Sequence, residues 1–295
     1  LLAMTRQREH RFLCGQRATR GYAKSEVHSR RLSRGATYWH MRAYAVICAV
    51  RTPSRRSCAA KIGAGSHHRI CLPPPALCFT ALAGVPEVAP HQALADVIAV
   101  ALKASALGLR EHDVIAVCQK IVSKSENRYV ELAGVAPSER AVELAAVCRK
   151  DARLVELVLR ESTRVVRCVK DVLIVRHRLG FVVANAGIDQ SNIEGAEQRA
   201  LLLPENPDAS AAQLRTQLEQ RYGVRIGVII TDSFGRAWRL GVCGTCIGCA
   251  GIAALRDLRG RPDRFGRALR VTQIAVADEI AAAATLVMGE ADEGK

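Results

Sequence analysis

The chain has 295 residues, of which 49% are hydrophobic, and its 43 basic and 28 acidic side chains give a net charge of +15. This apolar content excludes a disordered protein, and the length is sufficient for one large or two modest domains. The longest apolar run of the first half, at 43–50, is far short of the roughly 20 residues that a bilayer requires, so we expect no membrane-spanning protein.

The charge is divided unevenly along the chain. Residues 1–78 contain 15 Lys and Arg but only two acids, Glu9 and Glu26, whereas residues 79–295 contain 28 basic and 26 acidic side chains. We therefore divide the chain into a basic, Cys- and Arg-rich extension at 1–78 and a nearly neutral domain at 79–295.

The extension shows no sustained hydrophobic period, so we expect it to be unstructured. Three interpretations stay open for it: a targeting peptide rich in Arg and Ser, a nucleic-acid-binding arm, and an upstream translation outside the functional unit. The few aromatic residues among the basic ones argue against base stacking. The cysteines occur without a secretory signal, so we expect reduced thiols and a cytoplasmic protein.

From residue 79 onward, predicted helices and strands alternate. We expect helices over 92–107, 137–147, from 152, over 208–222 and over 278–288, and strands over 113–118, 164–169, 172–175, 181–184, 224–231 and 269–276. Because hairpin-like strands cluster in the middle of this order, an α+β fold is favoured over a plain parallel doubly wound sheet.

Polar residues gather where the predicted strands end. Gln119 to Lys124 follow the strand at 113–118, a position where open sheets present ligands and where a lysine can neutralise a phosphate. Asp189 and Asn192 lie in the loop after the strand at 181–184. A solvated turn is the alternative for both segments, since Asp, Asn and Gly also favour turns.

Two further acidic segments follow later elements. Asp232 and Ser233 follow the strand at 224–231, and their oxygens are of the kind that Mg²⁺ and Mn²⁺ prefer. Residues 288–295 place three acids after the last helix, which is also typical of a helix cap. Standard phosphate-binding loops and an H-E-x-x-H motif do not occur in the sequence.

The most conspicuous motif is Cys243-x2-Cys246-x2-Cys249. This spacing opens bacterial iron–sulfur sites, but the fourth Cys and its Pro are missing. Four glycines between 241 and 251 favour a tightly packed backbone in which small residues fit.

Taken together and in this order, the segments resemble the coenzyme F420-0:L-glutamate ligase (gamma-glutamyl ligase) family, as a stand-alone ligase domain. The resemblance covers essentially all of 80–295, through the stretches 84–88, 119–126, 177–192, 229–239, 251–258 with 266–267, and 271–294.

The resemblance implies GTP-dependent formation of an amide bond between L-glutamate and the terminal carboxylate of the deazaflavin coenzyme F420-0. Transfer of the γ-phosphate of GTP to that carboxylate would form an acyl phosphate and GDP. Attack by the glutamate amine would then release phosphate. The family fold implied is an unusual mixed-sheet α+β fold that forms an intertwined homodimer. Two divalent ions, Mg²⁺ or Mn²⁺, and a potassium ion are implied as well.

The resemblance also assigns roles by position. Asp189 and Asp232 resemble the ligands of one divalent ion, Ser233 and Glu290 those of a second, and Lys124 joins the two aspartates as a catalytic residue. The implied GTP contacts are Val85, Pro86, Glu87, Val88, Gln119, Lys120, Lys124, Asn192, Met288, Gly289, Glu290, Ala291, Asp292, Glu293, Gly294 and Lys295.

The chain departs from the family pattern in two places. Gly244 stands where bacterial relatives often carry an acid, and the chain stops at Lys295, where relatives continue into a short apolar strand, so we expect a C-terminally truncated domain. An inactive or truncated ligase homologue is therefore kept as an alternative. A nucleic-acid-binding protein that acts through residues 1–78 is the other.

Overall fold

The computed structural model describes residues 48–50, 77–193 and 195–289. The largest sheet in this part of the chain is mixed, because its two central strands are parallel to each other and each pairs antiparallel with an outer strand. Its strands, in spatial order, are β1 (Cys48–Val50), β2 (Val114–Cys118), β8 (Gly227–Gly235) and β9 (Val242–Ala250). The predicted α+β class with a mixed sheet is confirmed.

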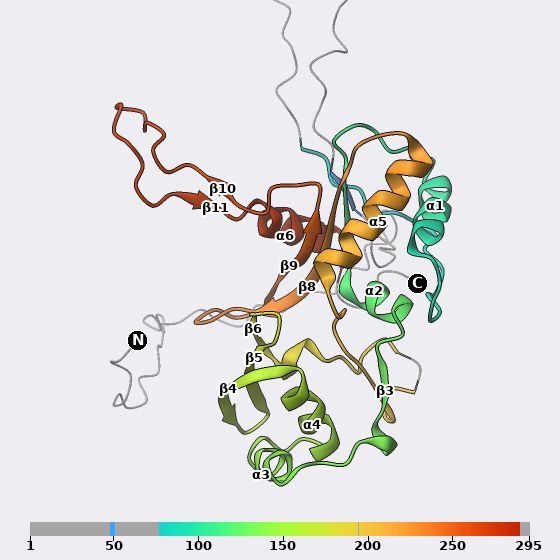
Figure 1. The fold of residues 1–295 in the computed structure, drawn as a ribbon, viewed down its shortest axis with the longest axis vertical. Helices are drawn as coiled ribbons and strands as arrows, with labels where there is room; N and C mark the ends of the chain where they lie inside the picture. Colours follow the sequence, from blue (N-terminus) through green and yellow to red (C-terminus); the bar gives the residue numbers. More distant parts are fainter. Residues whose placement is uncertain (1–47, 51–76, 194, 290–295) are drawn as a thin grey trace, which may run out of the picture. The chain divides into compact units, whose positions relative to one another are not determined.

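Both faces of this sheet are covered by helices, which is why its central strands are continuous apolar runs in the sequence. Val117 and Ile230 belong to a core with α1 and α5, whereas Ala116 and Ile229 belong to a second core with α6. Figure 1 shows α1 and α5 on the opposite side of β8 and β9 from α6. The bounds of these helices are α1 (Leu94–Ala104), α5 (Pro207–Tyr222) and α6 (Val276–Met288).

A smaller antiparallel sheet packs against two helices that the sequence also predicts. Ser138 and Asp151 begin these helices, and each side chain accepts a hydrogen bond from a backbone N–H of the first turn. The elements are α3 (Glu139–Cys148), α4 (Ala152–Arg160), β4 (Ser162–Val169), β5 (Val172–His177) and β6 (Val182–Ala184).

The remaining elements are short. β3 pairs with β7 and β10 with β11, each pair antiparallel. Their bounds are α2 (Gln119–Ser125), β3 (Tyr129–Glu131), the 3₁₀ helices η1 (Leu132–Gly134) and η2 (Asn185–Gly187), β7 (Arg199–Leu201), β10 (Arg256–Asp257) and β11 (Gln273–Ile274).

Several expected boundaries are wrong. The strand expected at 224–231 begins at Gly227 and continues to Gly235, because β9 pairs with it along that length. The strand expected at 269–276 is limited to Gln273–Ile274, because α6 already begins at Val276. Cys48–Val50 pair with β2, so the expectation of an unstructured extension is wrong for these three residues.

The Gly- and Cys-rich segment forms β9, which the sequence did not predict as a strand. A Cβ at Gly244 would lie 2.1 Å from Thr285 Oγ1 and 2.6 Å from the Ala281 carbonyl oxygen, and one at Gly248 would lie 2.4 Å from the Pro207 carbonyl carbon. The tight packing expected there is therefore confirmed. It also explains Gly244 itself, since an acid at this position would overlap α6.

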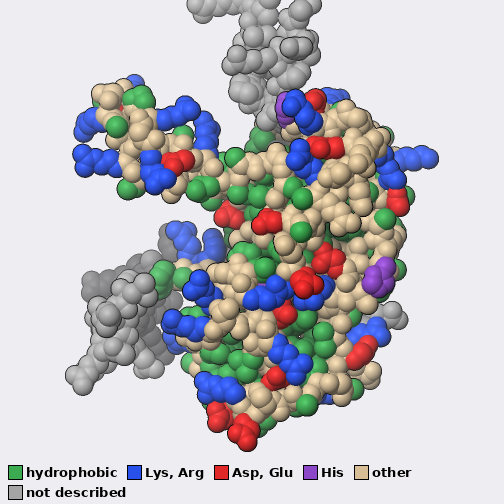
Figure 2. All heavy atoms as spheres, viewed as in Figure 1, with side chains coloured by type: hydrophobic (Ala, Val, Ile, Leu, Met, Phe, Trp, Pro, Cys, Tyr) green, Lys and Arg blue, Asp and Glu red, His purple; other side chains and the backbone are tan. Residues whose placement is uncertain are grey.

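Residues 253–275, which we call the basic hairpin, join β9 to α6 and contain β10 and β11. They hold six arginines and two aspartates, and Figure 2 shows the basic side chains gathered there. Phe265 and Val271 of the basic hairpin are 76% and 84% exposed. In the part of the chain that the structure describes, no helix is long and apolar enough to cross a membrane.

Candidate active site

The parallel pairing of β2 and β8 brings two of the predicted segments to one edge of the sheet. Cys118 at the end of β2 lies opposite Thr231 of β8. Gln119 and Lys120 begin α2 directly after Cys118, while Asp232 and Ser233 continue β8 beyond Thr231. Ligands of open α/β sheets bind at such carboxyl ends of strands. Asp232 thus lies inside a strand and not in a turn after it.

Lys120 and Asp189 form an ion pair at this edge. Lys120 Nζ lies 2.9 Å from Asp189 Oδ2 and donates to Ser191 Oγ at 2.9 Å, and Ser191 Oγ donates to Asp189 Oδ1 at 2.8 Å. The backbone of Asp189 exchanges two hydrogen bonds with Leu201, of 2.9 and 3.0 Å. The loop that carries Asp189 is therefore held by β7 on one side and by Lys120 on the other.

Asp232 lies at the same edge of the sheet, because it follows Thr231, which pairs with Cys118 directly before α2. Burial raises the pKa of the Cys118 thiol to about 11; the Lys120 backbone N–H opposes this rise, and the negative charges of Asp232 and Asp189 add to it. Asp232 Oδ1 also accepts a hydrogen bond of 2.8 Å from the Ser233 backbone N–H.

Lys124 is the second lysine of α2 that the sequence singled out. It is only 7% exposed, and its Nζ donates to the carboxylate of Glu87, whose side chain is 82% exposed. The structure thus joins two residues of the expected GTP contacts that are 37 positions apart. A lysine that is buried along its stem and aimed at an exposed carboxylate presents its charge at the surface.

The other expected GTP contacts are placed differently. The side chains of Val88, Gln119 and Met288 are buried, so a ligand could meet these residues only through the main chain. Val85 packs against the core, and Asn192 has a left-handed φ of 55°. Glu290, Ala291, Asp292, Glu293, Gly294 and Lys295 lie outside the described residues.

The side-chain atoms at this edge of the sheet are of the type that binds a hard cation. Asp189, Asp232 and Ser233 offer only oxygen atoms. Among the described residues, no group of three or more His, Cys, Asp or Glu side chains is placed to hold a metal ion. Mg²⁺ is commonly held by one or two carboxylates together with substrate phosphates, so two aspartates fit that ion.

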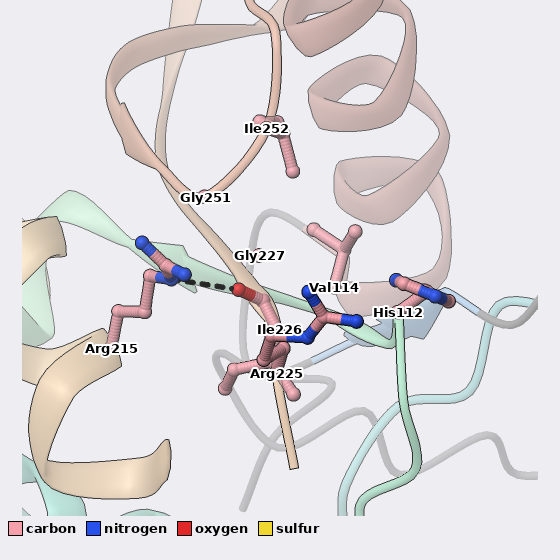
Figure 3. Close-up of a pocket in the computed structure, with 8 residues that line it drawn as sticks. All are labelled: His112, Val114, Arg215, Arg225, Ile226, Gly227, Gly251 and Ile252. Carbon is pink, nitrogen blue, oxygen red and sulfur yellow. Dashed lines mark hydrogen bonds between the residues drawn. The ribbon is translucent and has the colours of Figure 1, made fainter.

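A cavity of about 260 Å³ lies at the other ends of β2 and β8 (Figure 3). Arg215 Nε donates there to the Ile226 carbonyl oxygen at 3.0 Å. The lining residues are His112, Val114, Arg215, Arg225, Ile226, Gly227, Gly251 and Ile252. None of them belongs to the predicted site, so the candidate site and this cavity are separate.

Two features of the site escaped the sequence-based predictions. Ser191 bridges Lys120 and Asp189, and the only available signal was its place two residues after an aspartate, where turn-forming hydroxyls commonly occur. Phe234 of β8 meets Phe181 edge to face, with ring centroids 5.6 Å apart. This contact joins β8 to the residue before β6, which belongs to another sheet, and nothing in the local sequence indicates it.

Comparison with known proteins identifies the family. Residues 84–295 match the family model described as F420-0:Gamma-glutamyl ligase. The chain belongs to this family. It is 44% identical over 208 residues to the Coenzyme F420:L-glutamate ligase of Methanopyrus kandleri, a match that covers 70% of this chain and 80% of the relative. The proteins of the same name from Archaeoglobus fulgidus and Methanothermobacter thermautotrophicus are 44% and 41% identical over 211 residues, covering 72% of this chain and 82% and 83% of the relatives.

Family membership makes the chain a ligase of the gamma-glutamyl type, an enzyme that forms an amide bond. The resemblance drawn from the sequence is confirmed by both comparisons. The residues gathered at the edge of β2 and β8 belong to the matched range.

Proposed function

We propose that the chain is a coenzyme F420-0:L-glutamate ligase that uses GTP and divalent metal ions. The observation that carries the proposal is the placement of the Lys120–Asp189 ion pair and of Asp232 at the carboxyl ends of β2 and β8. It occurs in a member of a family whose curated relatives are named for this reaction.

The roles follow from charge and position. Asp189, Asp232 and Ser233 would hold divalent ions with Glu290, and such ions would supply neutralisation of phosphate charge and polarisation of the reacting oxygens. Lys120, paired with Asp189, and Lys124, paired with Glu87, would neutralise phosphate oxygens as point charges. The main chain at 85–88 and at 288–295 would complete the GTP contacts.

The reaction then proceeds in two balanced steps. The terminal carboxylate of coenzyme F420-0 attacks the γ-phosphorus of GTP, and the bond to the β,γ-bridging oxygen breaks to release GDP. The amine of L-glutamate attacks the acyl carbon, the carbon–nitrogen bond forms, phosphate leaves with its electron pair, and the amine proton passes to solvent. The enzyme contributes positioning and charge neutralisation, which dominate phosphoryl transfer.

A homodimer is part of the same proposal. Trp238 and Leu240, at the tip between β8 and β9, are 91% and 95% exposed, and the basic hairpin exposes Phe265 and Val271. Large exposed apolar side chains on projecting segments are typical of interfaces between subunits. Sedimentation of the full chain tests it: Phe265→Asp should shift a dimer toward monomer, whereas a monomeric wild type would refute the dimer. The potassium ion and the cytoplasmic location stay predictions.

The ligase proposal is tested with the full chain, GTP, Mn²⁺ or Mg²⁺, L-glutamate and coenzyme F420-0. Mass spectrometry should detect the mass of one added glutamate, and omission of GTP or metal should abolish it. Asp232→Asn should lower kcat at least about 100-fold, since one transition-state charge contact is commonly worth that factor. Asp171→Asn, in the turn between β4 and β5, is the matched control.

Two results would contradict this proposal. If no adduct forms under any of these conditions, the ligase activity is refuted and the inactive homologue takes its place. If GTP binds equally well with and without divalent metal, the roles of Asp189 and Asp232 are wrong. Salt-dependent binding of nucleic acid that disappears with deletion of residues 1–78 would favour the second alternative.

A further inference from the structure

Glu161 lies between α4 and β4, and its carboxylate faces three basic side chains. Its Oε2 is 2.9 Å from Arg178 Nε, and its Oε1 is 3.5 Å from a terminal nitrogen of Arg128. Its side chain is 13% exposed. Burial acts to raise the pKa of Glu161, but His177, Arg178 and Arg128 outweigh it and hold the pKa at about 2. The group is therefore a fixed negative charge at neutral pH.

The two arginines extend from Glu161 to other segments of the chain. Arg178, in the turn between β5 and β6, donates to the Glu205 carbonyl oxygen at 2.8 Å. Arg128, which follows α2, donates through Nε to the Leu203 carbonyl oxygen at 2.9 Å. One carboxylate thus ties together the β5–β6 turn, the segment after α2 and the segment before α5.

His177 connects this network to the aromatic contact. It is fully buried, and its Nδ1 accepts a hydrogen bond of 3.0 Å from the Leu179 backbone N–H, which assigns the ring hydrogen to Nε2. Nε2 faces Glu161 Oε2 at 3.4 Å but is not aligned for a hydrogen bond, so the two groups are linked by proximity alone. The His177 ring stacks on Phe181, with centroids 6.3 Å apart, and Phe181 meets Phe234 of β8.

The two ends of this chain of contacts lead to the two aspartates of the candidate site. Phe234 is two residues from Asp232 on β8. Phe181 begins the segment that runs through β6 and η2 to Asp189. Besides β7 and Lys120, the contact of the β5–β6 hairpin with β8 therefore also connects Asp189 to Asp232.

We propose that Glu161 is a positioning residue of the ligase: through Arg178, His177, Phe181 and Phe234 it seats the β5–β6 hairpin on β8 and so fixes the Asp189 carboxylate relative to Asp232. The proposal rests on the proposed function, because it concerns the carboxylates that the reaction uses. Misplacement of reacting groups by about 1 Å can cost about 100-fold in rate. A β5–β6 hairpin that is seated less firmly on β8 should therefore lower kcat and leave substrate affinity little changed.

The test compares Glu161→Gln with Glu156→Gln, which is on α4 and also removes a carboxylate paired with an arginine, Arg160 at 2.9 Å. Hydrogen–deuterium exchange of residues 182–193 should accelerate about tenfold in Glu161→Gln and stay unchanged in Glu156→Gln. Exchange at the start of α3 should accelerate only in Glu156→Gln, because Glu156 also accepts hydrogen bonds from the backbone N–H and the hydroxyl of Ser138. With glutamate varied, Glu161→Gln should lower kcat about tenfold and change KM less than about threefold.

Phe234→Leu cuts the same connection at its other end. It should reproduce the faster exchange of residues 182–193, and the double variant with Glu161→Gln should be no worse than the more severe single variant, because both changes break one path. If Glu161→Gln does not fold, Arg178→Gln replaces it in the same cycle.

Equal exchange rates at 182–193 in Glu161→Gln and Glu156→Gln would overturn the positioning role. So would a double variant of Glu161→Gln and Phe234→Leu whose effect is the product of the two single effects, because the two residues would then act independently. A wild-type chain without ligase activity would refute the proposed function instead. The exchange measurements would then still decide whether Glu161 controls the Asp189 segment.

Discussion

The carboxylate of Glu161 makes a quantitative prediction about stability at acid pH. Burial acts to raise the pKa of this carboxyl, but the neighbouring His177, Arg178 and Arg128 lower it more, so that the pKa is about 2 instead of the ordinary 4.5. Because one pKa unit corresponds to 1.36 kcal/mol, the charged form stabilises the folded protein by about 3 kcal/mol at neutral pH.

The sign follows from the lowered pKa. The stabilisation is fully present above the unfolded-state pKa of 4.5 and is lost as the pH falls through about 2. About 2 kcal/mol of it should disappear between about pH 6 and pH 3. The free energy of unfolding of the wild type should therefore fall toward that of Glu161→Gln over this range, since the variant has no carboxylate to protonate at this position.

Urea unfolding followed by circular dichroism measures both proteins at each pH, which removes the titration of all other groups from the comparison. Glu143→Gln, on the exposed surface of α3, is the control and should differ from the wild type by a constant amount. A difference between wild type and Glu161→Gln that stays constant within about 0.5 kcal/mol from pH 6 to pH 3 would refute the reasoning.

Two substitutions and one labelling experiment test the site and the packing around it. Lys120→Ala should raise the KM for GTP about tenfold or more by removing a charged contact, and steady-state kinetics with an unchanged KM would contradict its phosphate role. Gly244→Ala should lower Tm by about 2–8 °C, because its Cβ would overlap Thr285 and the Ala281 carbonyl; calorimetry that shows no loss would refute this close packing. Burial raises the pKa of Cys246 to about 12, so iodoacetamide should label it near pH 8 only after denaturation, and rapid labelling of the folded protein would count against this burial.

The order of most helices and strands, and the polar segments that follow them, can be predicted from local sequence alone. Hydrophobic periodicity and helix caps are local properties, so the run 113–118 and the cap at Ser138 identify their elements without reference to distant residues. The likeness of the segments to one family, read in order along the chain, was likewise available from the sequence.

Tertiary structure decided what depends on residues far apart in the chain. β8 continues through Asp232 because β9 pairs with it, and β9 tolerates only small residues such as Gly244 because α6 packs onto it. Lys120 reaches Asp189, 69 positions away in the sequence, and Glu161 lies beside Arg128 and Arg178. No local sequence pattern indicates these contacts, because their partners are far apart in the chain. Their free energy depends on the low-dielectric surroundings that the folded chain creates.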